Sequence, residues 1–253
     1  PLIQAYRNAL LLLTRQEAND FEQFKYNLNE SAKDFSTAEQ NSLFTVATNF
    51  CIVKINDGEE QFADELLNIY EIMLNNRLVY DGKFIRPGMF KNIVSAGLRA
   101  KQFDWTINFI ETCKKDISPD YRQMLTDLCI ANFKQRTGEF QEAANILTQL
   151  LNLESYLELD RKQLLLKCWF ELDEHNEFYT HADAFKGFLK TNKNISDEQK
   201  QKNRDFATIA IKTFKLKNGE GRETKQSIQR LLDKTVTADN AWLQEKLDEM
   251  PDS

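Results

Sequence analysis

From Ser118 onward the chain reads SPDYRQMLTDLCIANFKQRTGEFQEAANILTQLLN. Ser118 is a candidate N-cap, and Pro119 stands at the first helical position, where its missing N–H costs nothing. Gly138 ends this helix, and a second helix with an apolar stripe follows at once. Small Ala131 and Ala143 stand where paired helices approach closely. The stretch therefore predicts two antiparallel helices joined by a tight glycine turn.

The pattern of this stretch recurs along the chain. In each copy an anchor residue at the turn is followed by apolar pairs at helical intervals. The anchors are Phe62, Phe103, Phe140, Phe178 and Gly221, and successive ones lie 41, 37, 38 and 43 residues apart. A period in this range is typical of stacked helix pairs, which build extended binding surfaces.

The recurrence predicts an all-α fold, a right-handed α-solenoid of about five to six antiparallel helix pairs with a C-terminal capping helix. The unit at 118–152 resembles a tetratricopeptide repeat most closely, whereas Thr106 and His181 replace small Ala143 in other units. We expect a single helical-repeat domain over residues 1–253. Its parts are a leading helix pair at 1–35, units at about 36–80, 86–117, 118–152, 155–193 and 196–234, and a capping helix at about 238–250.

Local signals mark several helix boundaries. Ser36 or Thr37, followed by Glu39 and Gln40, predicts an N-cap, and Asn56-Asp57-Gly58 ends the same helix. No segment reads as a strand of confident length, and a loop is expected between Asp81-Gly82 and Pro87-Gly88. Helical spacing marks the leading helix at Ile3, Tyr6, Leu10 and Leu13, and the capping helix at Trp242, Leu243 and Leu247.

Composition agrees with a folded helical protein. Hydrophobic residues make up 42% and charged residues 28% of the chain, which is enough to bury a core. Only 8 Gly and 4 Pro occur, too few for the turns of an all-β fold or for glycine-rich phosphate loops. The scattered cysteines form no CxxC pair and indicate buried thiols in a reducing compartment; they are Cys51, Cys113, Cys129 and Cys168.

The start of the chain gives an expectation about localisation. The longest apolar run, Ala9 to Leu13, is far shorter than the roughly 20 residues of a membrane-spanning helix. Without a recognisable secretory signal, a cytoplasmic protein is expected. Because Pro1 stands where a methionine would, we also expect a native N-terminal part before this sequence, so the localisation is provisional.

Some segments carry a resemblance. They are Phe50-Cys-Ile-Val-Lys-Ile-Asn56, Lys91-Asn-Ile-Val-Ser-Ala-Gly-Leu-Arg99, Phe103-Asp104-Trp105, Arg161, Leu164-Leu-Leu-Lys167 and Asn192-Lys-Asn-Ile-Ser196. Over nearly its whole length the chain resembles an uncharacterised family of bacterial helical-repeat proteins. The resemblance implies that the chain matches the C-terminal part of longer proteins, and it brings no activity and no catalytic residue.

Residues that usually carry chemistry are not arranged for it. His175 and His181 are six residues apart, unlike the four-residue spacing with which two histidines on a helix bind one metal. Carboxylates are abundant, but they suit solvated helix faces and first turns. The chain has no GxSxG, phosphate-binding loop or HExxH motif. We therefore expect a protein that is not an enzyme and that uses no cofactor or metal.

Residues 200–234 are basic in an otherwise acidic chain. They hold ten Lys and Arg against four Asp and Glu, whereas the whole chain has a net charge of −6. A basic stripe can contact phosphates, and helical repeats can bind single-stranded RNA. Phe206 and Phe214 in this segment suit a core better than base stacking. Nucleic-acid binding is therefore an alternative function, and a solvated helix face is the plain interpretation.

The leading hypothesis is a module that binds a protein or peptide partner. First helices of successive units would line a groove, and residues at four-residue intervals share one face of such a helix. The candidate binding residues are Lys91, Ser95 and Arg99 in one unit and Asn132 and Arg136 in the next. Trp105 is either a packing residue or an exposed contact for a partner.

Overall fold

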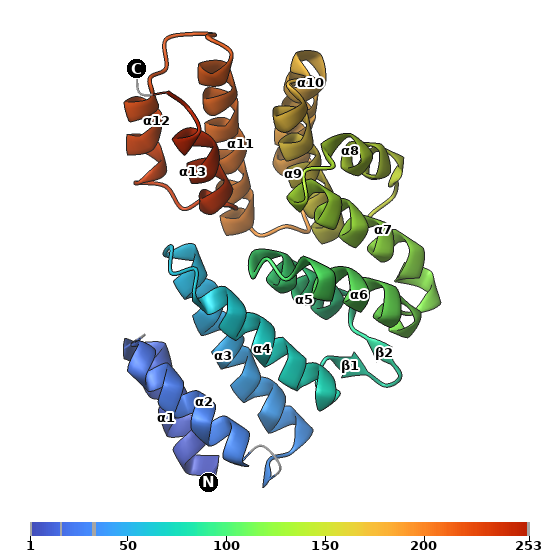
Figure 1. Ribbon diagram of the computed structural model, residues 1–253, viewed down its shortest axis with the longest axis vertical. Helices are drawn as coiled ribbons and strands as arrows, with labels where there is room; N and C mark the ends of the chain where they lie inside the picture. The colour runs from blue at the N-terminus through green and yellow to red at the C-terminus, as the bar shows by residue number, and fades with distance from the viewer. Residues whose placement is uncertain (1, 16, 32–33, 252–253) are drawn as a thin grey trace. The chain divides into compact units, whose positions relative to one another are not determined.

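The computed structural model describes residues 2–15, 17–31 and 34–251, which form 13 α-helices, a short 3-10 helix and one two-stranded hairpin (Figure 1). Each helix packs mainly on helices close to it in sequence, so the predicted all-α class is confirmed. The chain divides into two compact units, residues 1–129 and 130–253.

The elements in order are α1 (Leu2–Arg15), α2 (Ala18–Ser31), α3 (Thr37–Asn56), α4 (Phe62–Asn75), β1 (Tyr80–Asp81), β2 (Phe84–Ile85), α5 (Pro87–Arg99), α6 (Phe103–Cys113), η2 (Lys114–Asp116), α7 (Pro119–Arg136), α8 (Phe140–Gln149), α9 (Ser155–Leu172), α10 (His175–Thr191), α11 (Asp197–Lys217), α12 (Lys225–Leu232) and α13 (Asn240–Asp248).

The first unit is built from three helix pairs, α1 with α2, α3 with α4, and α5 with α6. In Figure 1 these pairs follow one another from blue to green, and α1 also packs against α3, as α4 does against α5. Phe21, Phe50 and Phe62 join the first two pairs, with ring centroids 4.8 to 5.8 Å apart. Each pair thus buries apolar surface against its neighbour, as stacked repeats do.

The ends of α3 follow the predicted signals. The Ser36 hydroxyl accepts a hydrogen bond from the Glu39 backbone N–H, and the Glu39 carboxylate accepts one from the Ser36 N–H. This capping box satisfies two N–H groups that the first turn would otherwise leave unpaired. At the other end Gly58 adopts a φ of +90°, a conformation that favours glycine, and the chain turns toward α4.

The loop expected after Asp81 is a small hairpin. Tyr80 pairs with Ile85 and Asp81 with Phe84, and Gly82 makes the turn with a φ of +57°. Leu78 and Val79, which precede the hairpin, and Ile85 within it are buried, and this burial anchors the hairpin to the unit. Strands of two residues are too short to show the alternation by which a strand is recognised in sequence, so the expectation of a plain loop was wrong here.

The pair α5 and α6 approaches closely at Gly97. A Cβ atom at Gly97 would lie 2.3 Å from the Thr106 hydroxyl oxygen and 3.3 Å from the Trp105 ring. Thr106 is fully buried and donates its hydroxyl hydrogen bond to the Gln102 carbonyl at 2.7 Å. In this unit glycine on the first helix therefore makes room for the larger threonine on the second.

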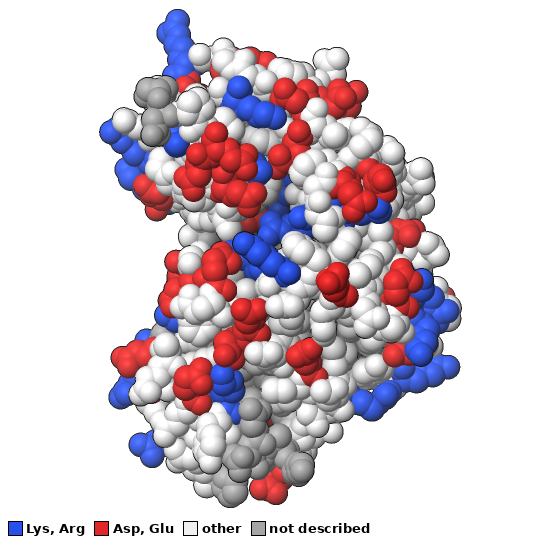
Figure 2. Space-filling model, viewed as in Figure 1, with Lys and Arg blue, Asp and Glu red and all other residues white. Residues whose placement is uncertain are grey.

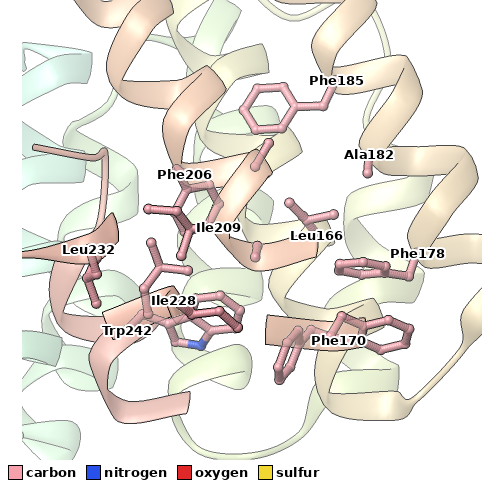
Figure 3. Packing of buried hydrophobic residues seen from close by; sticks show 14 of the residues in the cluster. Leu166, Phe170, Phe178, Ala182, Phe185, Phe206, Ile209, Ile228, Leu232 and Trp242 are labelled. Carbon is pink, nitrogen blue, oxygen red and sulfur yellow. The ribbon is translucent and has the colours of Figure 1, made fainter. Parts of the chain in front are cut away.

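The second unit contains α8 to α13 and one continuous apolar cluster (Figure 3). Phe178 stacks on Phe214 with centroids 4.0 Å apart, and Phe170 meets Trp242 edge-on at 5.1 Å. Phe206 and Phe214 are fully buried, which confirms that they are core residues. The cluster joins α9, α10, α11 and α12 to the last helix, α13.

The anchors of the repeat pattern are helix starts in three cases. Phe62, Phe103 and Phe140 are the first residues of α4, α6 and α8, whereas Phe178 is the fourth residue of α10. Gly221, the anchor of the unit at about 196–234, does not begin a helix. It adopts a φ of +89° in a turn, and α12 begins later, after the N-cap Thr224 accepts a hydrogen bond from the Ser227 N–H.

The cysteines are free thiols within helices. Cys51, Cys129 and Cys168 are buried and Cys113 is half-buried at the end of α6. Burial raises the pKa of Cys51 and of Cys168 to about 12, so neither thiol ionises near neutral pH. The prediction of buried thiols is confirmed for Cys51, Cys129 and Cys168, and it was wrong for the half-buried Cys113.

Candidate functional site

The predicted binding row on α5 is positioned by the helix start. Pro87 is the first helical residue, where it needs no N–H partner. Arg86 before it donates hydrogen bonds to the Leu78 carbonyl at 2.8 Å and to the Val79 carbonyl at 3.4 Å. These bonds hold the start of α5 to the residues just before β1. The buried face of the helix then carries Phe90, Ile93, Val94, Gly97 and Leu98.

The row itself is partly engaged within the unit. Ser95 is exposed, and Lys91 and Arg99 are half-buried on either side of it. Arg99 binds Glu60 through two hydrogen bonds, from Nε at 3.0 Å and from Nη2 at 2.6 Å. Since Glu60 precedes α4, this ion pair joins two successive helix pairs. Arg99 therefore has a structural contact that a ligand would have to share or displace.

The predicted row on α7 lies in the other unit. Asn132 and Arg136 are half-buried one turn apart, and Gln135 beside them is buried. Because Lys91, Ser95 and Arg99 belong to the first unit, the five predicted residues form two rows, each described within its own unit. One row lies on α5 and the other on α7.

The sequence interpretation missed an exposed face of α3. From Gln40 to Val53 the chain has no charged residue, although α3 is partly at the surface. Ile52 is 38% and Val53 is 37% exposed, and the Asn49 amide makes no hydrogen bond with the described residues. The exposed positions are Ser42, Thr45, Asn49, Ile52, Val53 and Asn56. We call them the α3 face; the uncharged run of sequence was the signal that could have found it.

Trp105 is a packing residue. Its ring stacks on Phe109 at 5.4 Å between centroids, nearly parallel, and lies against Gly97 of α5. Only part of the side chain is exposed. Of the two interpretations, the structure supports packing.

The basic segment makes many contacts of its own. Lys200 pairs with Asp197 at 3.4 Å, and Lys202 pairs with Glu198 at 2.6 Å on the same helix. Three more cations reach other elements: Lys212 pairs with Glu223, Lys217 with Asp173 at 3.2 Å, and Lys225 donates to the Met250 carbonyl at 2.8 Å. At the upper left of Figure 2, where α11 to α13 lie, acidic side chains are interspersed with basic ones. These carboxylates reduce the positive potential that a phosphate backbone would meet.

The histidines occupy separate environments on α10. His175, the first residue of the helix, lies 3.0 Å from a Glu220 oxygen through Nδ1. His181 donates from Nε2 to the Lys162 carbonyl at 2.9 Å, and burial lowers its pKa to about 4. Within the described part of the chain, no three His, Cys, Asp or Glu side chains gather as a metal site would require.

Buried lysines join α9 to α13, and sequence reasoning missed them. Lys167 of α9 lies 2.5 Å from Asp239 and faces the Trp242 ring, with its Nζ 5.5 Å from the ring centroid. Lys246 of α13 lies 2.9 Å from Glu171 of α9, and nearby carboxylates raise its pKa against the opposing effect of burial. Both ion pairs therefore hold α9 to the C-terminal segment, and the carboxylates around Lys246 favour the charged form of its ammonium.

Comparisons with known proteins give no family for the chain. No protein-family model, no curated protein and no solved structure matches it. The resemblance to bacterial helical-repeat proteins thus stays an expectation from the sequence. Among residues 2–15, 17–31 and 34–251, no helix has the length and apolar character needed to cross a membrane.

Proposed function

We propose that the protein is a tetratricopeptide-like helical-repeat module that binds a segment of a partner protein. The α3 face is the observation that carries this proposal. It is exposed over about four turns of a helix and carries amides, hydroxyls and aliphatic groups without a single charge. The centre of a protein interface is typically depleted in charge, whereas an ordinary solvated helix face is charged.

The chemistry of the α3 face suits a peptide backbone. The Asn49 amide offers both a donor and an acceptor, and Ile52 one turn away offers apolar contact. Ser42 and Thr45 already donate to carbonyls of their own helix, at 3.0 and 2.7 Å, so their hydroxyls remain available as acceptors. A partner segment lying along α3 would therefore find hydrogen bonds and apolar contacts in alternation.

The test introduces charge at the centre of the α3 face. We expect Ile52→Glu and Asn49→Glu to reduce recovery of specific partners at least tenfold in quantitative affinity purification from native cells. Tyr26→Glu is the matched control, because Tyr26 is 66% exposed on the neighbouring helix α2. Equal recovery of every partner by wild type and Ile52→Glu would overturn the proposal.

The predicted rows are tested in the same assay. Lys91→Glu with Arg99→Glu reverses the charge of the α5 row, and Asn132→Glu with Arg136→Glu changes the α7 row. If a row contributes to the binding site, its double variant loses the same partners as Ile52→Glu. Because Arg99 also pairs with Glu60, a charge-preserving Arg99→Lys variant separates loss of binding from loss of the ion pair.

Nucleic-acid binding through residues 200–234 stays the alternative prediction. It requires affinity that falls steeply with salt, because phosphate contacts release counterions. Lys200, Lys202 and Lys212 already pair with carboxylates, so the basic segment supports nucleic-acid binding less than the α3 face supports protein binding. A gel-shift titration with single-stranded RNA and DNA at low salt that shows no binding would remove it.

A further inference from the structure

Helix α1 has a second apolar face that nothing in the described structure covers. Its buried residues, Ala5, Asn8, Ala9 and Leu12, pack toward α2 and α3. Four other large apolar side chains lie elsewhere on the helix. Ile3 is 86%, Tyr6 43%, Leu10 61% and Leu13 56% exposed. We call these four residues the α1 stripe.

The spacing of the α1 stripe is that of a helix-packing seam. Its members are separated by three, four and three residues, so they lie on one side of the helix over about 15 Å of its axis. The mean direction of the stripe is about 130° around the helix axis from that of the buried residues, given 100° per residue. The apolar arc of α1 is therefore too wide to be covered by α2 and α3 alone.

The charge beside the stripe indicates what covers it. Arg7 is exposed about 80° around the helix axis from the mean direction of the stripe, whereas Arg15 lies about 160° away, on the far side of α1. Helix α1 has no acidic residue, and Arg7 forms no ion pair with the described residues. A helix seam flanked by a cation is complementary to one flanked by carboxylates. Two antiparallel copies of α1 would instead bring their Arg7 side chains together, and one cation is too few for an anionic membrane surface.

We propose that the α1 stripe is a docking surface for an amphipathic helix whose apolar seam is flanked by Asp or Glu. Such a helix would lie along α1, with its apolar side chains between Ile3 and Leu13 and its carboxylates near Arg7. This surface is separate from the α3 face, and the inference stands if the proposed function of that face fails.

Two synthetic 21-residue helical peptides test the proposal by fluorescence anisotropy with the full chain. Both carry Leu at positions a and d of each heptad; one has Glu at positions e and g, and its twin has Lys there. Repulsion between like-charged flanks keeps each peptide from self-associating. We expect the Glu peptide to bind at least tenfold more tightly than the Lys peptide.

Variants locate the binding on α1. Leu10→Gln with Leu13→Gln should weaken binding of the Glu peptide at least tenfold, and Arg7→Glu should shift the preference toward the Lys peptide. Leu151→Gln is the matched control, because Leu151 is 73% exposed in the second unit. Ile52→Glu should leave peptide binding unchanged, which separates this surface from the α3 face.

Several outcomes would overturn the proposal. Equal binding of both peptides, no binding of either, or binding unaffected by Leu10→Gln with Leu13→Gln would each do so. A dimer detected by light scattering and lost in that double variant would assign the stripe to a second copy. Binding to vesicles containing phosphatidylserine, lost in the same variant and without peptide binding, would assign it to a membrane surface.

Discussion

The first and last helices of the chain bury their apolar residues very differently. In α13, Leu243 and Leu247 are fully buried and Trp242 is 2% exposed, while the outward positions carry Glu245, Asp248 and Glu249. In α1, the α1 stripe stays exposed beside the exposed Arg7. An array of repeats needs a polar outer face at its ends to stay in solution. Helix α13 has such a face, and α1 has the second apolar face of an internal helix.

The contrast has a cause in side-chain size. On α1 the buried positions hold small Ala5 and Ala9 with Asn8 and a single large apolar residue, Leu12, while the four side chains of the α1 stripe project away. On α13 the packing positions hold large side chains, and Lys246 adds an ion pair with Glu171 of α9. A terminal helix therefore closes the core only when its large residues and its neighbours lie on the same side.

The largest expected effect on stability is at α13, whose apolar residues are buried. Trp242→Ala should lower the free energy of unfolding by about 3 kcal/mol, the lower end of the range for a buried aromatic. The reason for the lower end is that the buried indole N–H of Trp242 has no hydrogen-bond partner among the described residues. Urea denaturation followed by circular dichroism measures this. A loss below about 0.5 kcal/mol would show that α13 does not close the core.

Next in size is the tie between α9 and α13. Asp239→Ala should cost about 2 to 3 kcal/mol, because it leaves the buried Lys167 ammonium unpaired and removes the cap that accepts from the Trp242 N–H at 3.0 Å. Asp239→Asn retains a cap acceptor and loses the charge. The difference between the two variants in the same denaturation measurement separates cap from ion pair, and equal losses would mean that the cap contributes nothing.

A smaller effect should follow pH. His181 has a folded-state pKa of about 4 against 6.5 for the ordinary value, so the unfolded chain binds more protons between these values. Its contribution to stability is present above pH 6.5 and is lost as pH falls toward 4. We expect a loss of at most about 1.5 kcal/mol between pH 6.5 and 5, absent in His181→Gln.

Hydrogen exchange shows where this pH effect acts. Both histidines belong to the second unit, so protection of α9 and α10 should fall with pH while that of α3 and α4 is unaffected by His181→Gln. The same pH dependence in wild type and His181→Gln would contradict the assignment to this imidazole.

The smallest expected effect on stability is at α1, where the stripe is exposed. Leu10→Gln with Leu13→Gln should change the free energy of unfolding by less than about 0.5 kcal/mol, because both side chains are already exposed. The same denaturation assay should therefore show a much smaller loss of stability for this double variant of α1 than for Trp242→Ala in α13. A loss above about 2 kcal/mol would mean that the stripe is covered within the chain itself.

Much of the fold could be predicted because its signals are local. Ser36 with Glu39, Pro119 and Gly138 mark helix ends through the chemistry of one turn, and the structure places helix ends there. The hairpin at 80–85 and the late start of α12 escaped prediction because short elements carry too little pattern. The predicted binding rows are on first helices, but the partner of Arg99, Glu60, is 39 residues away in sequence.

By itself the sequence determined the class of fold and the ends of the helices that carry clear capping signals, because capping groups and apolar spacing act within a few residues. Only the tertiary structure decided which apolar face of each helix is covered. Trp242 and Leu10 have the same kind of spacing in sequence, yet one is buried and the other exposed. The reason is that burial depends on which helices lie alongside, and residues far apart in the chain set that arrangement.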